Sequence, residues 1–94
     1  MSYIRKLEKI PYGNCRVAIL DNDVVELISY ETKVAVLDRR TGWLYVNGLY
    51  SATTRKHLSA FMAEYCGCDY RVAKRCATTG EWYNIFDREF LKAV

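Results

Sequence analysis

The sequence predicts a small α+β domain, in which an antiparallel sheet of about four to six strands is packed by one amphipathic helix. Apolar and polar residues alternate in the first half of the chain, between turn sequences, as they do in half-buried strands. A single apolar stripe with helical spacing follows. The length of 94 residues suits one domain. We therefore expect one domain over 1–94, divided into an N-terminal arm (1–13), a hairpin sheet (14–47), a helix (51–65) and C-terminal strands (68–90).

Turn sequences delimit the expected strands of the hairpin sheet. These strands cover residues 15–20, 24–30, 33–37 and 43–46. The turns between them are rich in Asp, Asn and Gly, which adopt left-handed conformations more readily than other residues. The last strand, Trp43 to Val46, is apolar on both faces. Such a strand is either covered on both sides or presents one face to a partner.

The helix is the clearest element of the sequence. Its apolar residues recur at i, i+3, i+4 and i+7, and they are Leu58, Phe61, Met62 and Tyr65. Ser51 or Thr53 can cap its start, and Gly67 suits its end. Beyond it, Cys68, Tyr70 and Val72 alternate with polar or small residues, which predicts a strand. A further strand is expected over 81–86, although a helical stripe would also fit Trp82, Ile85, Phe86 and Phe90.

The sequence contains no indication of a catalytic centre. The sole histidine, His57, lies beside the apolar stripe of the helix. About 13 Å of helix separates it from Cys66, too far for a hydrogen bond, which leaves Cys15 or Cys76 as thiols that it could meet. No glycine-rich phosphate loop, nucleophile elbow or catalytic pair of carboxylates occurs. We expect a protein that is not an enzyme.

The cysteines suggest a structural zinc site. The expected ligands are Cys15, Cys66, Cys68 and Cys76. Gly67 would let Cys66 and Cys68 bind from one turn, although this spacing differs from the usual C-x₂-C pair. On a straight strand Cys76 would lie about 26 Å from Cys68, so the fourth ligand is either Cys76 or His57. The alternative is that the cysteines are small buried residues of the core.

Aromatic residues are abundant, with eight Tyr and two Trp, and both types are enriched at protein interfaces. The residues expected to contact a partner are Trp43, Tyr45, Tyr50, Tyr70 and Trp82. A second, basic patch could bind nucleic acid and would consist of Arg55, Lys56, Arg71, Lys74 and Arg75. The net charge of +3 argues against an acidic mimic of nucleic acid and is too small to indicate nucleic-acid binding without a clustered patch. No signal peptide or long apolar segment is recognisable, so we expect a cytoplasmic protein.

The block Tyr50-Ser-Ala-Thr-Thr-Arg-Lys-His57 resembles one shared by short uncharacterised proteins of phages and mobile elements. The similarity extends into the preceding hairpins and covers about half of the chain. Such small phage proteins are often inhibitors of bacterial defence, including anti-CRISPR proteins that block Cas9, one type of which contains zinc. The resemblance implies an inhibitor that binds a protein or ribonucleoprotein such as Cas9 in the bacterial cytoplasm. The alternative is a small nucleic-acid-binding accessory or regulatory protein of a mobile element.

Overall fold

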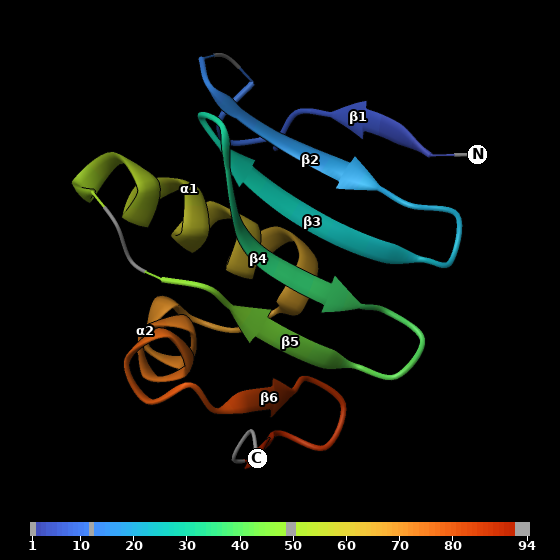
Figure 1. Ribbon diagram of the computed structural model, residues 1–94, viewed down its shortest axis with the longest axis vertical. Coiled ribbons are helices and arrows are strands. Elements are labelled where there is room, and N and C mark those ends of the chain that lie inside the picture. Colours follow the sequence, from blue (N-terminus) through green and yellow to red (C-terminus); the bar gives the residue numbers. More distant parts are fainter. Residues whose placement is uncertain (1, 12, 49–50, 92–94) are drawn as a thin grey trace.

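The computed structural model describes residues 2–11, 13–48 and 51–91. Its main feature is one antiparallel sheet whose strands follow one another in chain order (Figure 1). The seven strands are β1 (Tyr3–Arg5), β2 (Cys15–Ile19), β3 (Val24–Ser29), β4 (Thr32–Asp38), β5 (Trp43–Val46), β6 (Trp82–Asn84) and β7 (Glu89–Leu91). The helices lie between β5 and β6 and are α1 (Ala52–Phe61), the π-helical segment η1 (Met62–Cys66) and α2 (Tyr70–Thr79). The predicted α+β class is confirmed.

The first helix forms where the apolar stripe predicted it. The Ser51 hydroxyl accepts a hydrogen bond from the Thr54 N–H, which satisfies one of the unpaired donors at the helix start. The helical segment ends at Gly67, whose φ of +65° is left-handed. Leu58, Phe61 and Met62 are fully buried in the core. The stripe therefore packs against the sheet, as predicted.

The strand predicted after Gly67 is wrong, because residues 70–79 form the second helix, α2. The Asp69 carboxylate caps its start by accepting from the Arg71 N–H at 2.8 Å, and Gly80 ends it with a φ of +76°. Ala73 and Cys76, spaced by three residues, form the buried side of the helix. The alternation over 68–73 was too short to distinguish a strand from a helix, and packing against the sheet and α1 decided for the helix.

The sheet also has strands at both edges that lie outside the predicted strands. Strand β1 lies inside the expected N-terminal arm and pairs with β2, and β7 pairs with β6 at the other edge. The loop after β1 is held against η1, since Leu7 is fully buried and the Glu8 N–H donates to the Glu64 carboxylate at 2.8 Å. Short edge strands of this kind expose few unpaired backbone groups.

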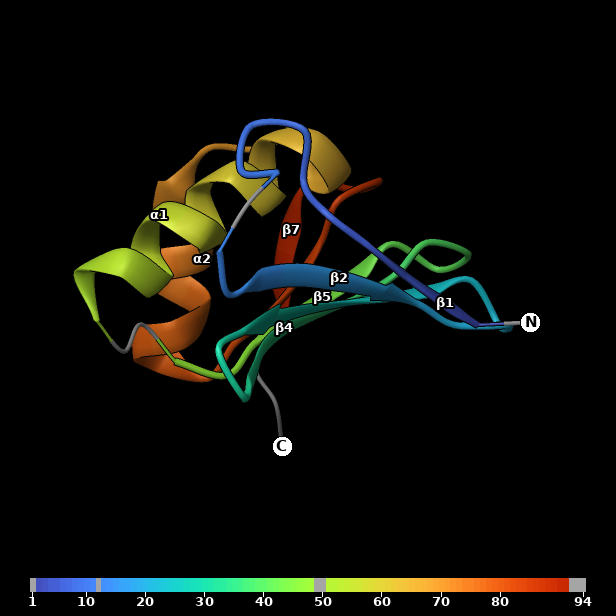
Figure 2. The same ribbon diagram turned by 90° about the horizontal axis from the view of Figure 1, so that it is seen from above.

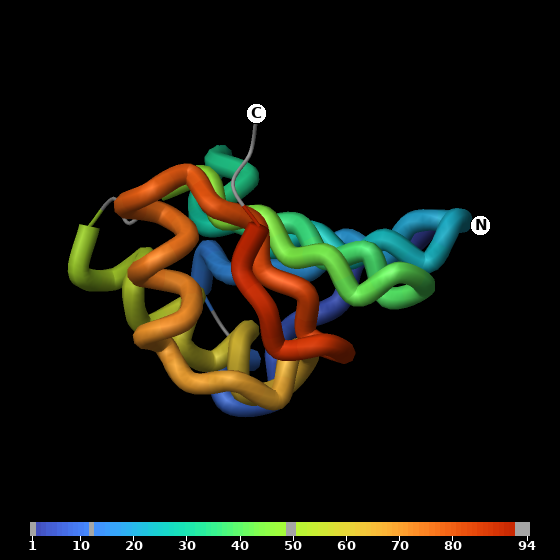
Figure 3. Tube along the Cα trace, turned by 90° about the horizontal axis from the view of Figure 1, so that it is seen from below, coloured from blue at the N-terminus to red at the C-terminus, as the bar shows by residue number. Residues whose placement is uncertain are grey.

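The helices cover only one face of the sheet, as Figures 1 and 2 show. The buried residues of neighbouring strands point toward the helices. One cross-strand row of such residues consists of Val17, Leu27, Ala35 and Val46. At the C-terminal edge the last hairpin turns toward the helical layer (Figure 3), and the Arg75 guanidinium of α2 lies 3.8 Å from the ring centroid of Phe90. The opposite face of the sheet is not covered by any described helix.

Candidate functional site

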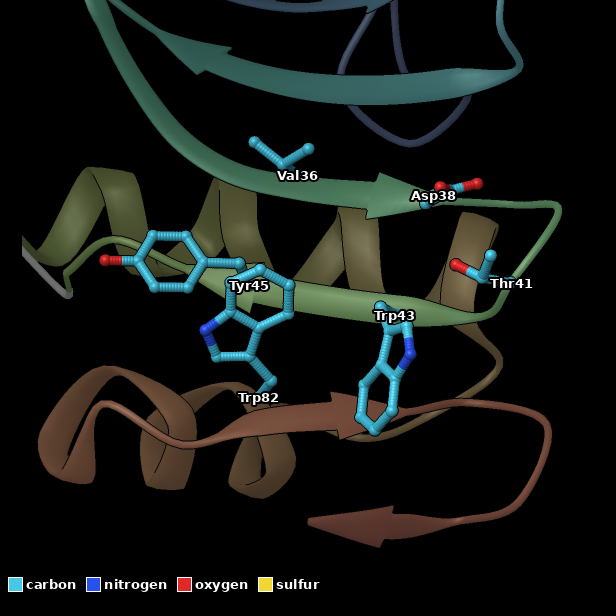
Figure 4. Close-up of a pocket in the computed structure, with 6 residues that line it drawn as sticks. All are labelled: Val36, Asp38, Thr41, Trp43, Tyr45 and Trp82. Atoms are coloured by element: carbon cyan, nitrogen blue, oxygen red, sulfur yellow. The ribbon is translucent and has the colours of Figure 1, made fainter. Parts of the chain in front are cut away.

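The uncovered face of the sheet carries a cluster of three aromatic side chains. Trp43 and Tyr45 alternate with the buried Leu44 and Val46 along β5, so both point away from the helices. Trp82 comes from the neighbouring strand β6. Its ring centroid lies 5.6 Å from that of Tyr45 and 6.5 Å from that of Trp43. Figure 4 shows the three rings on the side of the sheet opposite to the helices.

These rings form part of an open depression of about 430 Å³, which we call the aromatic pocket. Its lining residues are Val36, Asp38, Thr41, Trp43, Tyr45 and Trp82. The walls are almost entirely apolar. Asp38 and Thr41 lie together at the end of the pocket nearest the β4–β5 turn (Figure 4). The Asp38 side chain is 29% exposed, and its Oδ1 accepts a hydrogen bond from the Arg40 N–H at 3.0 Å.

The β4–β5 turn is bound to the end of β6 and to the two residues that follow it, which positions one side of the aromatic pocket. Gly42 has a φ of +85°, and a Cβ at this position would lie 2.7 Å from Cδ2 of Phe86. The Gly42 carbonyl accepts from the Ile85 N–H at 2.8 Å, and the Thr41 carbonyl accepts from the Asn84 amide at 3.0 Å. Only glycine combines this backbone conformation with such a close approach.

The other residues expected at a partner contact lie elsewhere. Tyr50 is outside the described residues. Tyr70 begins α2 in the helical layer, where it borders a small depression with Arg55, Lys56 and Ser59. The sequence prediction missed Val36, Asp38 and Thr41. Val36 could have been found, because its alternation with Ala35 and Leu37 in β4 places it on the outer face.

The expected cysteine ligands come from different elements, and Cys66, Cys68 and Cys76 lie near one another. Cys15 lies in β2, Cys66 ends η1, Cys76 lies in α2, and the Cys68 thiol donates to the Cys66 carbonyl at 3.3 Å. Among the described residues, no group of three or more His, Cys, Asp or Glu could hold a metal ion. Burial raises the pKa of Cys66 to about 12, an effect that the nearby Cys68 and Cys76 reinforce, and burial raises the pKa of Cys76 to about 11. These thiols are therefore protonated at neutral pH.

His57 belongs to a buried polar group that the sequence did not predict. Its Nδ1 lies 2.8 Å from the hydroxyl oxygen of Ser29, which is 3.2 Å from that of Thr54. In a hydrogen-bonded Ser–His pair, the serine can act as a nucleophile and the histidine as the base that activates it. Ser29, however, is only 2% exposed. The group links α1 to β3 and satisfies the polar atoms that this contact buries.

Two of the three basic residues of α2, Arg71 and Arg75, are paired with acidic neighbours. The Arg71 guanidinium lies 3.1 Å from the Asp69 carboxylate, and that of Arg75 lies 3.1 Å from Glu81. Such pairs leave less positive potential for phosphate groups than the count of basic residues suggests.

The fold and the pocket define a class of protein, a two-layer α+β domain with an antiparallel meander and an uncovered aromatic face. The chain belongs to DUF8033, a family of unknown function, whose profile matches residues 5–84. The matched segment includes every residue of the aromatic pocket and all four cysteines. Neither the search of curated proteins nor the search of solved structures found a match.

No helix in the described part of the chain is long and apolar enough to cross a membrane.

Proposed function

We propose that this protein is a binding protein without catalytic activity, and that the aromatic pocket and the sheet face around it contact a protein or ribonucleoprotein. The observation that carries this proposal is the one-sided cover of the sheet. Trp43, Tyr45 and Trp82 lie together on the face that the helices leave open. Trp82, one of the two tryptophans in the chain, is 40% exposed.

Large aromatic side chains on an open face are typical of interface hot spots. Tyr and Trp bring a large apolar area to a contact and lose little conformational freedom there. A partner residue that enters the pocket would be surrounded by Val36, Trp43 and Trp82 and removed from water. Most of the binding energy of an interface comes from a few anchors of this kind.

The absence of catalysis is a further part of the proposal. The one hydrogen-bonded Ser–His pair that the described residues offer, Ser29 and His57, lies inside the protein and lines none of the surface depressions described above. Ser29 is only 2% exposed, so a substrate could not reach its hydroxyl unless the surrounding residues moved. A role in packing α1 against β3 accounts for the pair without chemistry.

For the partner, the resemblance to phage and mobile-element proteins favours an inhibitor of bacterial defence that binds Cas9 in the bacterial cytoplasm. The test is to measure binding of the purified protein to the Cas9–guide RNA complex, together with DNA cleavage by that complex. Each alanine variant of Trp43, Tyr45 and Trp82 should lose about thirtyfold or more in affinity. Tyr3→Ala is a matched control, since Tyr3 is an exposed aromatic residue at the far edge of the sheet.

The outcomes separate the parts of the proposal. No binding to the complex removes Cas9 as the partner. Binding that is unchanged in all three pocket variants removes the aromatic pocket from the contact. Turnover of a substrate that depends on His57 would contradict the absence of catalysis.

The nucleic-acid alternative has less support, because Arg71 and Arg75 have acidic partners. The dependence of affinity on salt concentration distinguishes it from the proposed protein contact. Affinity through phosphate contacts falls steeply as salt rises, whereas affinity through an aromatic protein interface changes little.

A further inference from the structure

The aromatic pocket combines three features that bear on what it can bind. Its walls include three electron-rich rings, it has few hydrogen-bonding groups, and a carboxylate stands at one end. The Trp82 ring is inclined by 70° to that of Trp43 and by 57° to that of Tyr45. The rings that line the pocket are therefore inclined to one another and are not coplanar. Aromatic walls arranged in this way attract a cation through their quadrupoles.

The charge at the rim has the complementary sign. Asp38 is the acidic residue of the lining, and the basic group facing it is Arg40 of the same turn. The Arg40 side chain is mostly exposed, and its Nε is 4.0 Å from Asp38 Oδ1. At that distance and exposure the ion pair is weak. A cation in the pocket would gain from both the carboxylate and the rings.

The scarcity of acceptors restricts which cation fits. An ordinary lysine ammonium has three N–H donors, and burying it against apolar walls would leave donors unsatisfied. A quaternary ammonium has no N–H group and presents a surface of methyl groups. It can therefore be desolvated in an apolar pocket while it keeps its charge.

A second depression adjoins the aromatic pocket on the same face of the sheet. It measures about 200 Å³, shares Val36 and Tyr45 with the pocket, and continues past Lys33 to Asn47. This continuation offers space for the main chain on one side of an inserted side chain. A peptide fits this shape better than a small free ligand.

We propose that the aromatic pocket binds the trimethylated side chain of a lysine on the protein partner. This inference rests on the proposed function and names the group that the pocket recognises. Trp43, Tyr45 and Trp82 surround the quaternary ammonium, Asp38 supplies the opposite charge, and the adjoining depression holds the flanking peptide.

The experiment uses the tryptophan fluorescence of the intact protein, because both tryptophans of the chain line the pocket. The probes are N-acetyl-trimethyl-lysine methylamide, the same compound with unmethylated lysine, choline, and 3,3-dimethylbutanol, which is a neutral analogue of choline. Binding of the trimethyl-lysine compound should be saturable and about fivefold or more tighter than that of the lysine compound. Choline should bind more tightly than its neutral analogue, and more weakly than the trimethyl-lysine compound.

Variants assign the binding to the pocket. Trp82→Ala should weaken binding of the trimethyl-lysine compound by about tenfold, read from the remaining tryptophan, and Asp38→Asn by about threefold. Asp38→Asn keeps an oxygen that can accept from the Arg40 N–H. Tyr3→Ala should bind like the unaltered protein.

Equal binding of the methylated and unmethylated compounds overturns the inference, as does equal binding of choline and its neutral analogue. Tighter binding of choline than of the trimethyl-lysine compound also overturns it, because the ligand is then a small molecule. If the pocket variants lose affinity for a protein partner while no ammonium compound binds, only this inference fails and the proposed function stands.

Discussion

Trp43 and Trp82 meet edge to face across the β5–β6 pair, although every helical segment among the described residues lies between them in the chain. Trp43 is opposite Asn84 in the antiparallel register, and Trp82 lies two residues earlier, on the same face. The aromatic pocket therefore requires β6 to return to the sheet after the helices. It cannot form from the N-terminal hairpins alone.

Phe61→Ala should destabilise the protein by about 3–5 kcal/mol, because it creates a cavity in the core. Phe61 is 0% exposed, and its ring stacks on that of Tyr65 with centroids 5.4 Å apart. Urea titration followed by circular dichroism measures the free energy of unfolding. Ser59→Ala, on the exposed side of α1, is the control and should change it little. A loss below about 1 kcal/mol for Phe61→Ala would contradict the packing described here.

Gly42→Ala should be more damaging than Gly80→Ala, although both glycines have positive φ. A Cβ on Gly80 meets no atom within 4 Å, whereas one on Gly42 would lie 2.7 Å from the Phe86 ring and 2.9 Å from the Asn84 Oδ1. We expect a loss of about 1 kcal/mol for Gly80→Ala from backbone strain alone, and a larger loss for Gly42→Ala. Thermal unfolding of the two variants tests the order. Equal losses would indicate that the β4–β5 turn moves away from β6 at no cost.

Stability should fall as the pH drops below the ordinary histidine pKa of 6.5, because burial lowers the pKa of His57 in the folded protein. Between the lowered folded pKa and 6.5 the unfolded chain binds the proton and the folded protein does not. Acidification through this window therefore favours unfolding, and the full contribution is present above it. His57→Gln removes the titrating group. The unfolding free energy of this variant should no longer depend on pH in this window. An unchanged dependence would show that other titrating groups cause it.

Metal analysis tests the structural zinc predicted from the sequence. Zinc held by Cys15, Cys66, Cys68 and Cys76 would give about one zinc per chain, and Cys68→Ser would lower both metal content and melting temperature. Binding would have to bring Cys15 to the other thiols and remove protons from Cys66 and Cys76, whose pKa values are raised. Protein that is folded without metal and indifferent to a chelator would leave the cysteines as core residues.

The local sequence was sufficient to predict an element where one residue type determines the backbone conformation, or where a periodic pattern is long. The Ser51 cap, the left-handed Gly67 and the buried stripe of Leu58, Phe61 and Met62 all lie where the sequence placed them. The strand Trp43–Val46 has the predicted bounds. A strand was predicted over residues 68–73 because a few alternating residues fit either element, and only contacts with α1 and the sheet select the helix over 70–79.

The sequence by itself determined the α+β class and the common face of Trp43 and Tyr45, since alternation along a strand is a local property of the backbone. Tertiary structure decided that this face is the uncovered one and that Trp82, Val36 and Asp38 complete the pocket. It also decided that Tyr70 lies in the helical layer. These relations depend on which strands pair and on which side the helices pack, and both follow from contacts between residues that are distant in the chain.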